Sequence, residues 1–344
     1  MKISVCIPQY NRIAYLLKNL ERLECQTYTD IEVIISDDCS TDDTALRIAE
    51  LAGRYKYPII YSRNETNLGY DRNYRKSIEL ASGEYAFILG NDDALNAPDS
   101  LAFLADFLRN ENYPEIGYCN MVEGDESGTL VPRAHGNRVL GSGREVALKY
   151  YSSFSFVGGL IYKLDTFRKY NTDKCDGSIY SQMYLGVLMI LGGARLFCIE
   201  KPLVIKDLKI GDISRGSYTD RLARKWKDFR IVDGGLPSVI HVLIMGFRDA
   251  GVLSQQVLFI IFRRIYMLTF PYWIMDYRSH GAFPEAWGLF RGLKPKLNKD
   301  FELLSFRNKM RIRFVYIASA FVSLFFPLFL LRFLHKKAYG LFKK

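Results

Sequence analysis

Two adjacent carboxylates, Asp92 and Asp93, follow an apolar run that ends at Leu89 and Gly90. Like charges next to each other at the end of a strand are unfavourable unless a cation lies between them. Carboxylate oxygens suit Mg2+ and Mn2+, and such ions commonly bridge a protein to a phosphate group. The doublet therefore predicts a divalent metal site that holds a phosphate. The alternative is an acidic loop in which Asp93 or Asp99 caps the next helix.

A second acidic segment covers residues 37–43 with the sequence DDCSTDD. Asp38 lies at the tip of a predicted strand, where its carboxylate can accept hydrogen bonds from a nucleobase or a ribose. Asp42 and Asp43 fall in the first turn of a predicted helix, and there the helix dipole accounts for them as caps. Only Asp38 is therefore a candidate ligand-binding residue of this segment.

Short β-branched runs alternate with helical patterns over the first ninety residues. Strands are predicted at 3–7, 31–35, 58–61 and 85–89, and helices at 14–25, at 40–55 behind a capping box, and at 70–81. This alternation is typical of an α/β fold whose parallel sheet is covered on both faces. Polar clusters fall where the strands end, at Pro8–Asn11, Asp37–Ser40, Asn64–Gly69 and Gly90–Asp93. Because the carboxyl ends of parallel strands line the ligand crevice, we expect one site built from all four clusters.

Two arginines near these clusters carry charge that suits a nucleotide. Arg63 and Arg72 can offset a pyrophosphate or stack on a base. For each of them, a solvated surface arginine is the alternative. Farther along, strands are expected at 116–121, 154–162, 196–199 and 203–205, with a helix near 178–191.

Five segments form an ordered pattern: VCIPQYNR at 5–12, SDDCSTD at 36–42, NLGYDRN at 67–73, ASGEY at 81–85 and GNDD at 90–93. In this order and at this spacing they resemble the family 2 glycosyltransferases of GT-A fold. FVGGLIY at 156–162 and KPLVI at 201–205 are similar to the abequosyltransferase-like branch, which builds bacterial surface polysaccharide such as O-antigen. The resemblance implies a Rossmann-like, mixed but mainly parallel sheet flanked by helices.

The resemblance also implies roles for individual residues. Together with the candidates drawn from residue type and position, the nucleotide-binding set is Pro8, Gln9, Tyr10, Asn11, Asp38, Arg63, Arg72, Asn91 and Asp92. Asp38 matches an aspartate that contacts the nucleobase, and Asp92 matches the last aspartate of a DxD motif, which holds Mg2+ or Mn2+ on the diphosphate of a sugar nucleotide. The first aspartate of that motif, which usually touches the ribose, is Gly90 here. Asp93 is then the residue that would share the metal with Asp92.

The catalytic base is expected in the stretch 173–182. Inverting members of the family usually have a Glu-Asp pair near the start of a helix, and this stretch has none. Asp176 is the first candidate for the base and Asp173 the second, while the alternative is that either one caps the following helix. In the loop after the last strand, Lys206, Asp212 and Arg215 are candidates to close over the diphosphate, with a solvated loop as the alternative.

The net charge of +10 is concentrated at the C-terminal end. Residues 294–344 contain twelve lysines and arginines and two acids, so the rest of the chain is neutral. The basic residues flank an uncharged stretch, 314–331, that Pro327 interrupts. Basic charge on both flanks disfavours a single span and favours an interfacial or re-entrant helix on an anionic membrane surface. Residues 257–275 are expected to join it, with Arg263 and Arg264 extending toward the interface, and the alternative is that both segments are core helices.

Composition limits the other possibilities. Six scattered cysteines without a CxxC pair argue against a disulfide framework and a zinc site, and the first residues do not resemble a secretory signal. We therefore expect two domains, a catalytic domain at 1–215 and a helical membrane-associating region at 216–344, on the cytoplasmic face of the bacterial inner membrane. No nucleic-acid partner is expected, because the basic charge accompanies apolar sequence.

The sequence as a whole predicts a metal-dependent glycosyltransferase. It would move a sugar from a nucleoside-diphosphate sugar to a polyprenyl-diphosphate-linked glycan. One alternative is a sugar nucleotidyltransferase, which would have a Gly-rich turn after the first strand where this chain has Pro8–Asn11. The other is a non-catalytic nucleotide-sugar binder, which Gly90 and the missing Glu-Asp pair make conceivable.

Overall fold

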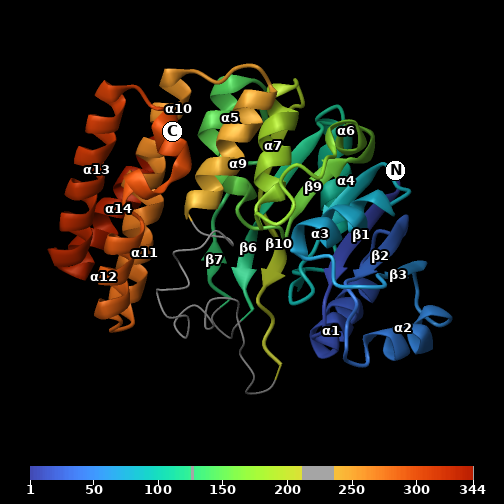
Figure 1. The fold of residues 1–344 in the computed structure, drawn as a ribbon. Coiled ribbons are helices and arrows are strands. Elements are labelled where there is room, and N and C mark those ends of the chain that lie inside the picture. The colour runs from blue at the N-terminus through green and yellow to red at the C-terminus, as the bar shows by residue number, and fades with distance from the viewer. Residues whose placement is uncertain (125–127, 211–235, 344) are drawn as a thin grey trace. The chain divides into compact units, whose positions relative to one another are not determined.

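The computed structural model describes residues 1–124, 128–210 and 236–343 (Figure 1). The chain divides into two compact units. Of the described residues, the first unit consists of 1–124, 128–146, 152–177 and 189–210, and the second of 147–151, 178–188 and 236–343. The second unit thus includes two short segments that the domain prediction assigned to the first.

The first unit contains a mixed sheet with helices on its faces. Its strands are β1 (Ile3–Gln9), β2 (Ile31–Asp37), β3 (Ile59–Arg63), β4 (Tyr85–Ile88), β5 (Ala94–Leu95), β6 (Ile116–Glu123), β7 (Leu130–Val131), β8 (Arg138–Gly141), β9 (Leu160–Lys163) and β10 (Leu196–Lys206). Its helices are α1 (Ile13–Glu24), α2 (Thr44–Ala52), α3 (Tyr70–Glu79), α4 (Ser100–Asn110) and α6 (Leu164–Tyr170). Helix α5 (Arg144–Tyr150), the 3-10 turn η1 (Tyr151–Phe154) and helix α7 (Ser181–Leu191) have residues in both units.

The strand order is β3-β2-β1-β4-β9-β6-β10-β5, with β7 beside β6 and β8 beside β10. The longest pairings are parallel: β1 with β2 and β4, β2 with β3, and β6 with β10. Strand β9 is antiparallel to both of its neighbours, β4 and β6. The register places Gln9, Asp37 and Arg63 side by side at the carboxyl ends of three strands. The predicted mixed, mainly parallel sheet is therefore confirmed.

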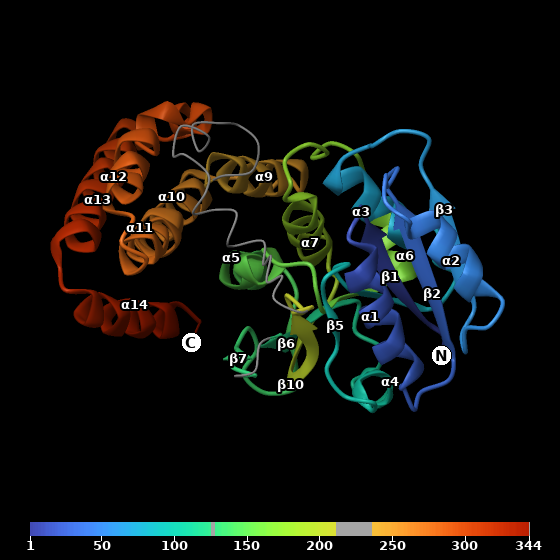
Figure 2. The same ribbon diagram turned by 90° about the horizontal axis from the view of Figure 1, so that it is seen from below.

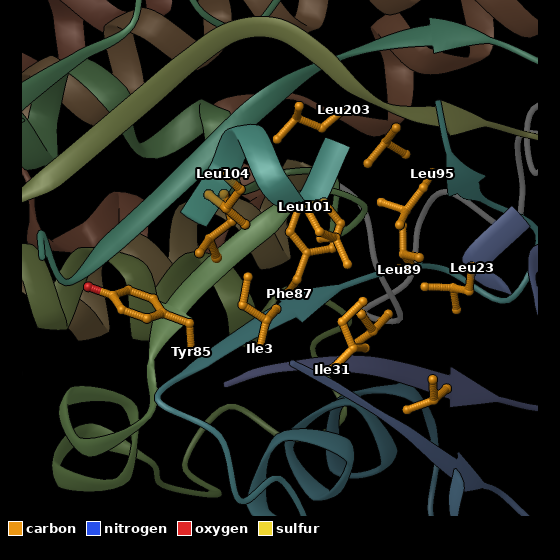
Figure 3. Packing of buried hydrophobic residues seen from close by; sticks show 14 of the residues in the cluster. Ile3, Leu23, Ile31, Tyr85, Phe87, Leu89, Leu95, Leu101, Leu104 and Leu203 are labelled. Carbon is orange, nitrogen blue, oxygen red and sulfur yellow. The ribbon is translucent and has the colours of Figure 1, made fainter. Parts of the chain in front are cut away.

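The core of this unit lies between one face of the sheet and helices α1, α2 and α4. Alternate residues of the strands, such as Ile3 and Phe87, point to this face because side chains alternate along a strand. They pack with Leu101 and Leu104 of α4 and with Leu23 of α1 (Figure 3). Helix α3 packs on β1 and β2, and α6 packs on β9. Strands β1, β2 and β4 are buried on both faces, which explains their nearly continuous apolar sequences.

Three local predictions are wrong. Helix α2 begins at Thr44 rather than at Ser40, and the Asp43 side chain makes no capping hydrogen bond. The carboxylate of Asp42 accepts hydrogen bonds from the backbone N–H of Ile13 and of Thr44, at 2.9 and 3.1 Å, so it fastens α1 to this loop. The segment 154–162 contributes only β9, and the two strands expected at 196–205 are one strand with an irregular register around Pro202.

The second unit is helical. Its elements are α9 (Leu236–Asp249), α10 (Gln255–Arg264), the π-helical turn η3 (Ile265–Thr269), α11 (Phe270–Ser279), α12 (Phe283–Gly292), the 3-10 turns η4 (Pro295–Leu297) and η5 (Lys299–Leu303), α13 (Phe306–Phe325) and α14 (Leu328–Lys343). Pro327 separates α13 from α14, which follow one another as two distinct helices in Figure 2. The uncharged stretch 314–331 is therefore not one helix, as expected where proline follows a helix end.

Helices α10, η3 and α11 run on as one helix, Gln255–Ser279. Among the described residues, this is the one helix long and apolar enough to cross a membrane by length and composition, and half of its apolar window is buried within the protein. Its buried residues include Phe262, Tyr266 and Phe270, whose rings pack on each other and on α13. Arg264 donates to the carbonyl of Leu148 rather than extending outward as predicted. One face of this helix is thus part of the core of its unit, which agrees with the alternative prediction of a core helix.

Glu32 stabilises the amino ends of the central strands, on the side of the sheet away from the candidate site. Its buried carboxylate accepts hydrogen bonds from Lys2, Ser4 and Ser82, at 2.5–2.7 Å, and from the N–H of Gly83. A Cβ at Gly83 would come within 2.6 Å of the Lys2 carbonyl oxygen, so no larger residue fits there. Part of the ASGEY segment is therefore structural. Burial acts to raise the pKa of Glu32, but the hydrogen bonds prevail and lower that pKa to about 2.

We predict that Glu32→Gln lowers the free energy of unfolding by about 1–3 kcal/mol at neutral pH, because charge-assisted hydrogen bonds are lost. The folded-state pKa lies below the unfolded value of about 4.3, so this stabilisation is complete above that value and disappears as the pH falls toward 2. Urea titrations of both proteins across this range measure the difference. Glu50→Gln, at an exposed ion pair, is the control. A difference between Glu32→Gln and the wild type that does not change with pH would contradict the assignment.

Candidate functional site

The loops after β1 and β2 are fastened together at the strand tips. Asn11 and Arg12 have φ values of 53° and 60°, a left-handed conformation that is unusual outside glycine. The N–H of Asn11 donates to the Ser40 hydroxyl at 2.8 Å, and the Asn11 side-chain oxygen accepts from the N–H of Thr41, also at 2.8 Å. Gln9 is fully buried beneath them, and its amide donates to the Asn11 carbonyl. Tyr10 is left exposed at the surface of this loop.

Asp37, next to the predicted Asp38, is a structural residue. Its carboxylate accepts from the N–H of Ser40 at 2.9 Å and from the Tyr61 hydroxyl at 2.5 Å. Burial, together with the hydrogen bond to Asp37, raises the pKa of Tyr61. The guanidinium of Arg63 donates to the Ser40 carbonyl at 3.0 Å, so this arginine covers the same loop. The buried Asp37 side chain thus joins the ends of β2 and β3.

Asp38 already has three hydrogen-bond donors from one loop. Its oxygens accept from the Asn64 amide at 2.8 Å, from the N–H of Leu68 at 2.7 Å and from the N–H of Gly69 at 3.0 Å. Its residue exposure is 3%. A carboxylate offers about four acceptor positions, so one remains for a ligand. Asp38 therefore orders the residues before α3, and its contact with a nucleobase stays a prediction.

Asn73 is a residue of the site to which the sequence interpretation gave no role. Its side-chain amide donates to the carbonyls of Gln9 and Ser36, at 3.2 and 2.9 Å, and its oxygen accepts from the Ser36 hydroxyl at 2.7 Å. It thereby ties α3 to β1 and β2. An asparagine on the buried face of a helix was the available signal. The neighbouring Arg72 instead donates to Glu79 on the same helix at 3.0 Å.

Asp92 and Asp93 differ sharply in their surroundings. Asp92 keeps 16% of its side chain exposed and accepts from the Arg12 guanidinium at 2.6 Å. Burial raises the pKa of Asp92, Arg12 opposes that rise, and the charge of Asp207 adds to it. Asp93 is almost completely buried, and its oxygens accept from the N–H of Gly90 and of Asp207, at 3.1 and 3.2 Å. Burial, followed by the charges of Asp92 and Asp207, raises the pKa of Asp93 well above its ordinary value.

These residues fit a metal that is held jointly with a ligand. Among the described residues, no three His, Cys, Asp or Glu side chains form a group that could hold an ion. Mg2+ is often held by one or two carboxylates together with substrate phosphates and water. Asp92, partly exposed beside a cation, fits this arrangement. Asp93 uses both oxygens on backbone N–H groups, and Asn91 donates to the Tyr10 carbonyl at 3.4 Å.

The position of the first aspartate of the DxD motif, which is Gly90 here, lies close against the Asp93 carboxylate. A Cβ at Gly90 would lie 2.6 Å from an Asp93 oxygen, and one at Gly158 would lie 2.4 Å from the same atom. The carboxylate of Asp93 therefore occupies the space that a side chain at position 90 would take. Gly159 has a φ of +74°, and its Cβ would meet the sulfur of Cys119. The two glycines of the FVGGLIY segment are thus required by close packing.

Arg133 stabilises the segment around Gly158 through hydrogen bonds to backbone carbonyls. The sequence interpretation did not predict this role. The side chain is buried, and its guanidinium donates to the carbonyls of Cys119, Phe156 and Gly158, at 2.7–3.0 Å, and more weakly to that of Ser153. The pKa of Arg133 is lowered by burial. Its position in a turn-rich segment offers no sequence signal, because the partners are backbone carbonyls.

The candidates for the base lie near α3. Asp176 accepts from two nitrogens of the buried Arg75, at 2.9 and 2.5 Å, and Arg75 also donates to Asn171. Asp173 is exposed. Lys206 forms ion pairs with Glu123 and Asp207, both at 3.2 Å. Asp212 and Arg215 lie outside the described residues.

A Rossmann-like sheet whose strand-end loops carry the polar residues defines the class of protein. Residues 4–170, just under half of the chain, match the model of "Glycosyl transferase family 2", so this part of the chain is a family 2 glycosyltransferase domain. The abequosyltransferase RfbV of Salmonella typhimurium is 36% identical over 225 residues, which cover 60% of this chain and 66% of that protein. A Campylobacter jejuni enzyme, "GalNAc(5)-diNAcBac-PP-undecaprenol beta-1,3-glucosyltransferase", is 34% identical over 97 residues, or 27% of this chain and 30% of its own length.

The similarity to a solved structure concerns the fold. The crystal structure of S. aureus TarS 1-349 with UDP superposes with a TM-score of 0.60 at 16% identity, covering 99% of this chain and 92% of that one. The GT-A fold class is therefore confirmed. The chain spans just under two thirds of RfbV and less than a third of the Campylobacter enzyme.

Gly90→Asp restores the aspartate that is typical of the family. We predict that this substitution lowers the free energy of unfolding. Overpacking costs about 1–3 kcal/mol, and a second carboxylate against Asp93 adds repulsion. Thermal and urea denaturation measure the change. Gly53→Asp is the matched control, since nothing lies within 4 Å of a Cβ there. Equal stability of Gly90→Asp and the wild type would show that Asp93 does not occupy this space.

Proposed function

We propose that this chain transfers a sugar from a nucleoside-diphosphate sugar to a lipid-linked glycan during assembly of a bacterial surface polysaccharide. The observation that carries the proposal is the placement of Asp92, partly exposed beside Arg12, at the end of β4 in a family 2 glycosyltransferase domain. The loops that end β1, β2 and β3 are joined to each other by the hydrogen bonds of Asn11, Asp37 and Asp38. Together they form a preorganised rim on which a nucleotide can bind.

The residues of this rim divide the work. Asp92 would hold Mg2+ or Mn2+, and the ion would neutralise the diphosphate as it departs. Asp93 would fix the backbone of Gly90 and Asp207 around the metal site by accepting their N–H groups. It is also the second candidate ligand for the metal. Arg12 carries a positive charge at the same place and is able to turn from Asp92 to a phosphate oxygen. Asp38 and the loop Pro8–Asn11 would contact the nucleoside.

The acceptor is proposed from the names of relatives. RfbV is named an abequosyltransferase, and the Campylobacter enzyme is named for an undecaprenol-diphosphate-linked glycan. A chain of this family with a basic, aromatic-rich C-terminal region suits an acceptor held at a membrane. We place the protein on the cytoplasmic face of the bacterial inner membrane, where sugar nucleotides are available.

The general base is proposed to be Asp176, with Asp173 as the second choice. A base in this role takes the proton of the acceptor hydroxyl as the new glycosidic bond forms. Each oxygen of Asp176 accepts one hydrogen bond from Arg75, which leaves an acceptor position on each oxygen for the proton. Arg75 would meanwhile orient the carboxylate.

Asp92→Ala is expected to abolish Mn2+-dependent hydrolysis of the sugar nucleotide and transfer of its sugar, because the carboxylate would bind the ion. The fold should stay intact, because this side chain is partly exposed and is not part of the hydrophobic core. Sugar release from a radiolabelled donor, with and without Mn2+, measures this. Asp99→Ala removes an exposed carboxylate paired with Lys201 and serves as the control. Near wild-type, Mn2+-dependent turnover of Asp92→Ala would refute the metal assignment. Binding of the sugar nucleotide without any turnover by the wild type would favour the non-catalytic alternative.

Asp176→Asn is expected to lower kcat by about a hundredfold or more with nucleotide affinity unchanged, because a general base acts only in the chemical step. Steady-state kinetics and nucleotide titration separate the two quantities. Melting temperature is recorded as well, since Asp176 also pairs with the buried Arg75. A fall in stability and nucleotide affinity with little loss of kcat would make Asp176 a structural residue. A larger loss in Asp173→Asn would place the base there.

A further inference from the structure

Helix α13 is apolar on two sides. One side carries Ile312, Tyr316, Ala320 and Leu324, which are buried against the other helices of its unit. Tyr316 donates to the carbonyl of Phe290, and its ring lies 5.7 Å from that of Tyr266. These contacts hold α13 firmly and determine which side it presents outward.

The outward side carries a continuous series of large apolar side chains, which we call the aromatic row. Its members are Phe306, Met310, Phe314, Ile317, Phe321 and Phe325. They are 48–80% exposed and recur every three or four residues, so they lie along one face of the helix. Exposed apolar surface of this extent marks an interaction site in a folded protein. The row begins eight residues before the uncharged stretch at 314–331, so the prediction located only part of it.

Basic residues flank the aromatic row at its N-terminal half. At 100° per residue, Arg307 and Arg311 fall on one side of the row, and Lys309 and Arg313 on the other. Lys309 pairs with Glu302, and Arg311 lies over the ring of Phe259 at 4.5 Å. After Glu302 the sequence contains no Asp or Glu. The charge contributed by α13 itself is therefore entirely positive, which favours an occupant that carries negative charge.

The charges distinguish between the candidate occupants. A second copy of the same face would bring more arginines and no acids. Among the described residues, Gln255–Ser279 is the helix that is long and apolar enough to cross a membrane, and α13 is not. The first two turns of α13 contain four basic residues. A helix with an apolar face bordered by lysine and arginine is typical of one that lies in the membrane interface. Anionic lipid headgroups supply the missing negative charge.

We propose that α13 lies parallel to an anionic bilayer, with the aromatic row in the acyl boundary and the flanking arginines on the lipid phosphates. The proposal deepens the proposed function, since it rests on that function for the lipid-linked acceptor at the same surface. It differs from tethering by a spanning segment, because one side of α13 stays packed on its own unit. The bilayer surface then completes the cover of this helix.

The test uses the full chain and sedimentation with vesicles. Vesicles of phosphatidylcholine with about a third phosphatidylglycerol are compared with pure phosphatidylcholine. Phe314→Ser with Phe321→Ser should reduce binding to the anionic vesicles by about tenfold or more. Arg307→Gln with Arg311→Gln should remove most of the preference for anionic lipid. Phe283→Ser, at an exposed phenylalanine on α12, is the matched control and should bind as the wild type does.

Three results would overturn the proposal. The first is a wild-type chain that ignores anionic vesicles, and the second is a double serine variant that binds them unchanged. The third is a wild-type dimer in light scattering that the serine variant converts to a monomer without loss of vesicle binding, which would assign the row to a second copy. Hydrolysis of the sugar nucleotide without lipid is measured in parallel and should be equal in all variants. Its absence from the wild type would refute the proposed function and leave the vesicle result standing.

Discussion

The buried carboxylate of Asp93 constrains the arrangement of three segments: its own loop after β4, the segment at Gly158 and the end of β10 at Asp207. A carboxylate taken out of water is costly unless donors surround it, and here the N–H groups of Gly90 and Asp207 supply them. The same carboxylate fills the space beside Gly90 and Gly158, so a side chain at either position would have to displace it. Asp92 immediately precedes Asp93 in the sequence. The backbone carbonyl of Asp92 accepts a hydrogen bond from the N–H of Leu208 at 2.7 Å. The one partly exposed carboxylate of the doublet is therefore held by a backbone that its buried neighbour organises.

Much of the fold was predictable because it depends on local pattern. Alternating apolar runs and helical periods indicated the parallel strands and their helices, and the polar clusters indicated their carboxyl ends. The antiparallel insertion of β9 between β4 and β6 was not predictable, because strand order depends on contacts between segments far apart in the sequence. The capping box failed for the same reason. The Ser40 hydroxyl accepts from the N–H of Asn11 instead of capping α2. Asp42 accepts from the N–H of Thr44 at the start of α2 and from the N–H of Ile13 at the start of α1.

The candidate site was predicted in outline and less well in detail. Residue type and position at a strand end indicated Asp38 and Asp92, yet they could not show that Asp38 already accepts three hydrogen bonds. Arg12 and Arg133 were missed because a single arginine in a loop has no distinctive spacing. Their partners, a carboxylate eighty residues away and a set of backbone carbonyls, become apparent only in the folded chain. The sequence indicated a missing motif aspartate at Gly90, and the structure adds that the Asp93 carboxylate lies where a side chain at Gly90 would begin.

The central claim is that the strand-end rim binds a nucleoside diphosphate together with a divalent metal at Asp92. Thermal denaturation of the wild-type chain with UDP, GDP, CDP or dTDP, each with and without Mn2+, tests it most directly. A ligand that binds only the folded state raises the melting temperature in proportion to the logarithm of its excess over Kd. The account predicts that one nucleotide raises the melting temperature clearly and that the rise requires Mn2+. No rise with any of the four, or an equal rise without the metal, would contradict it.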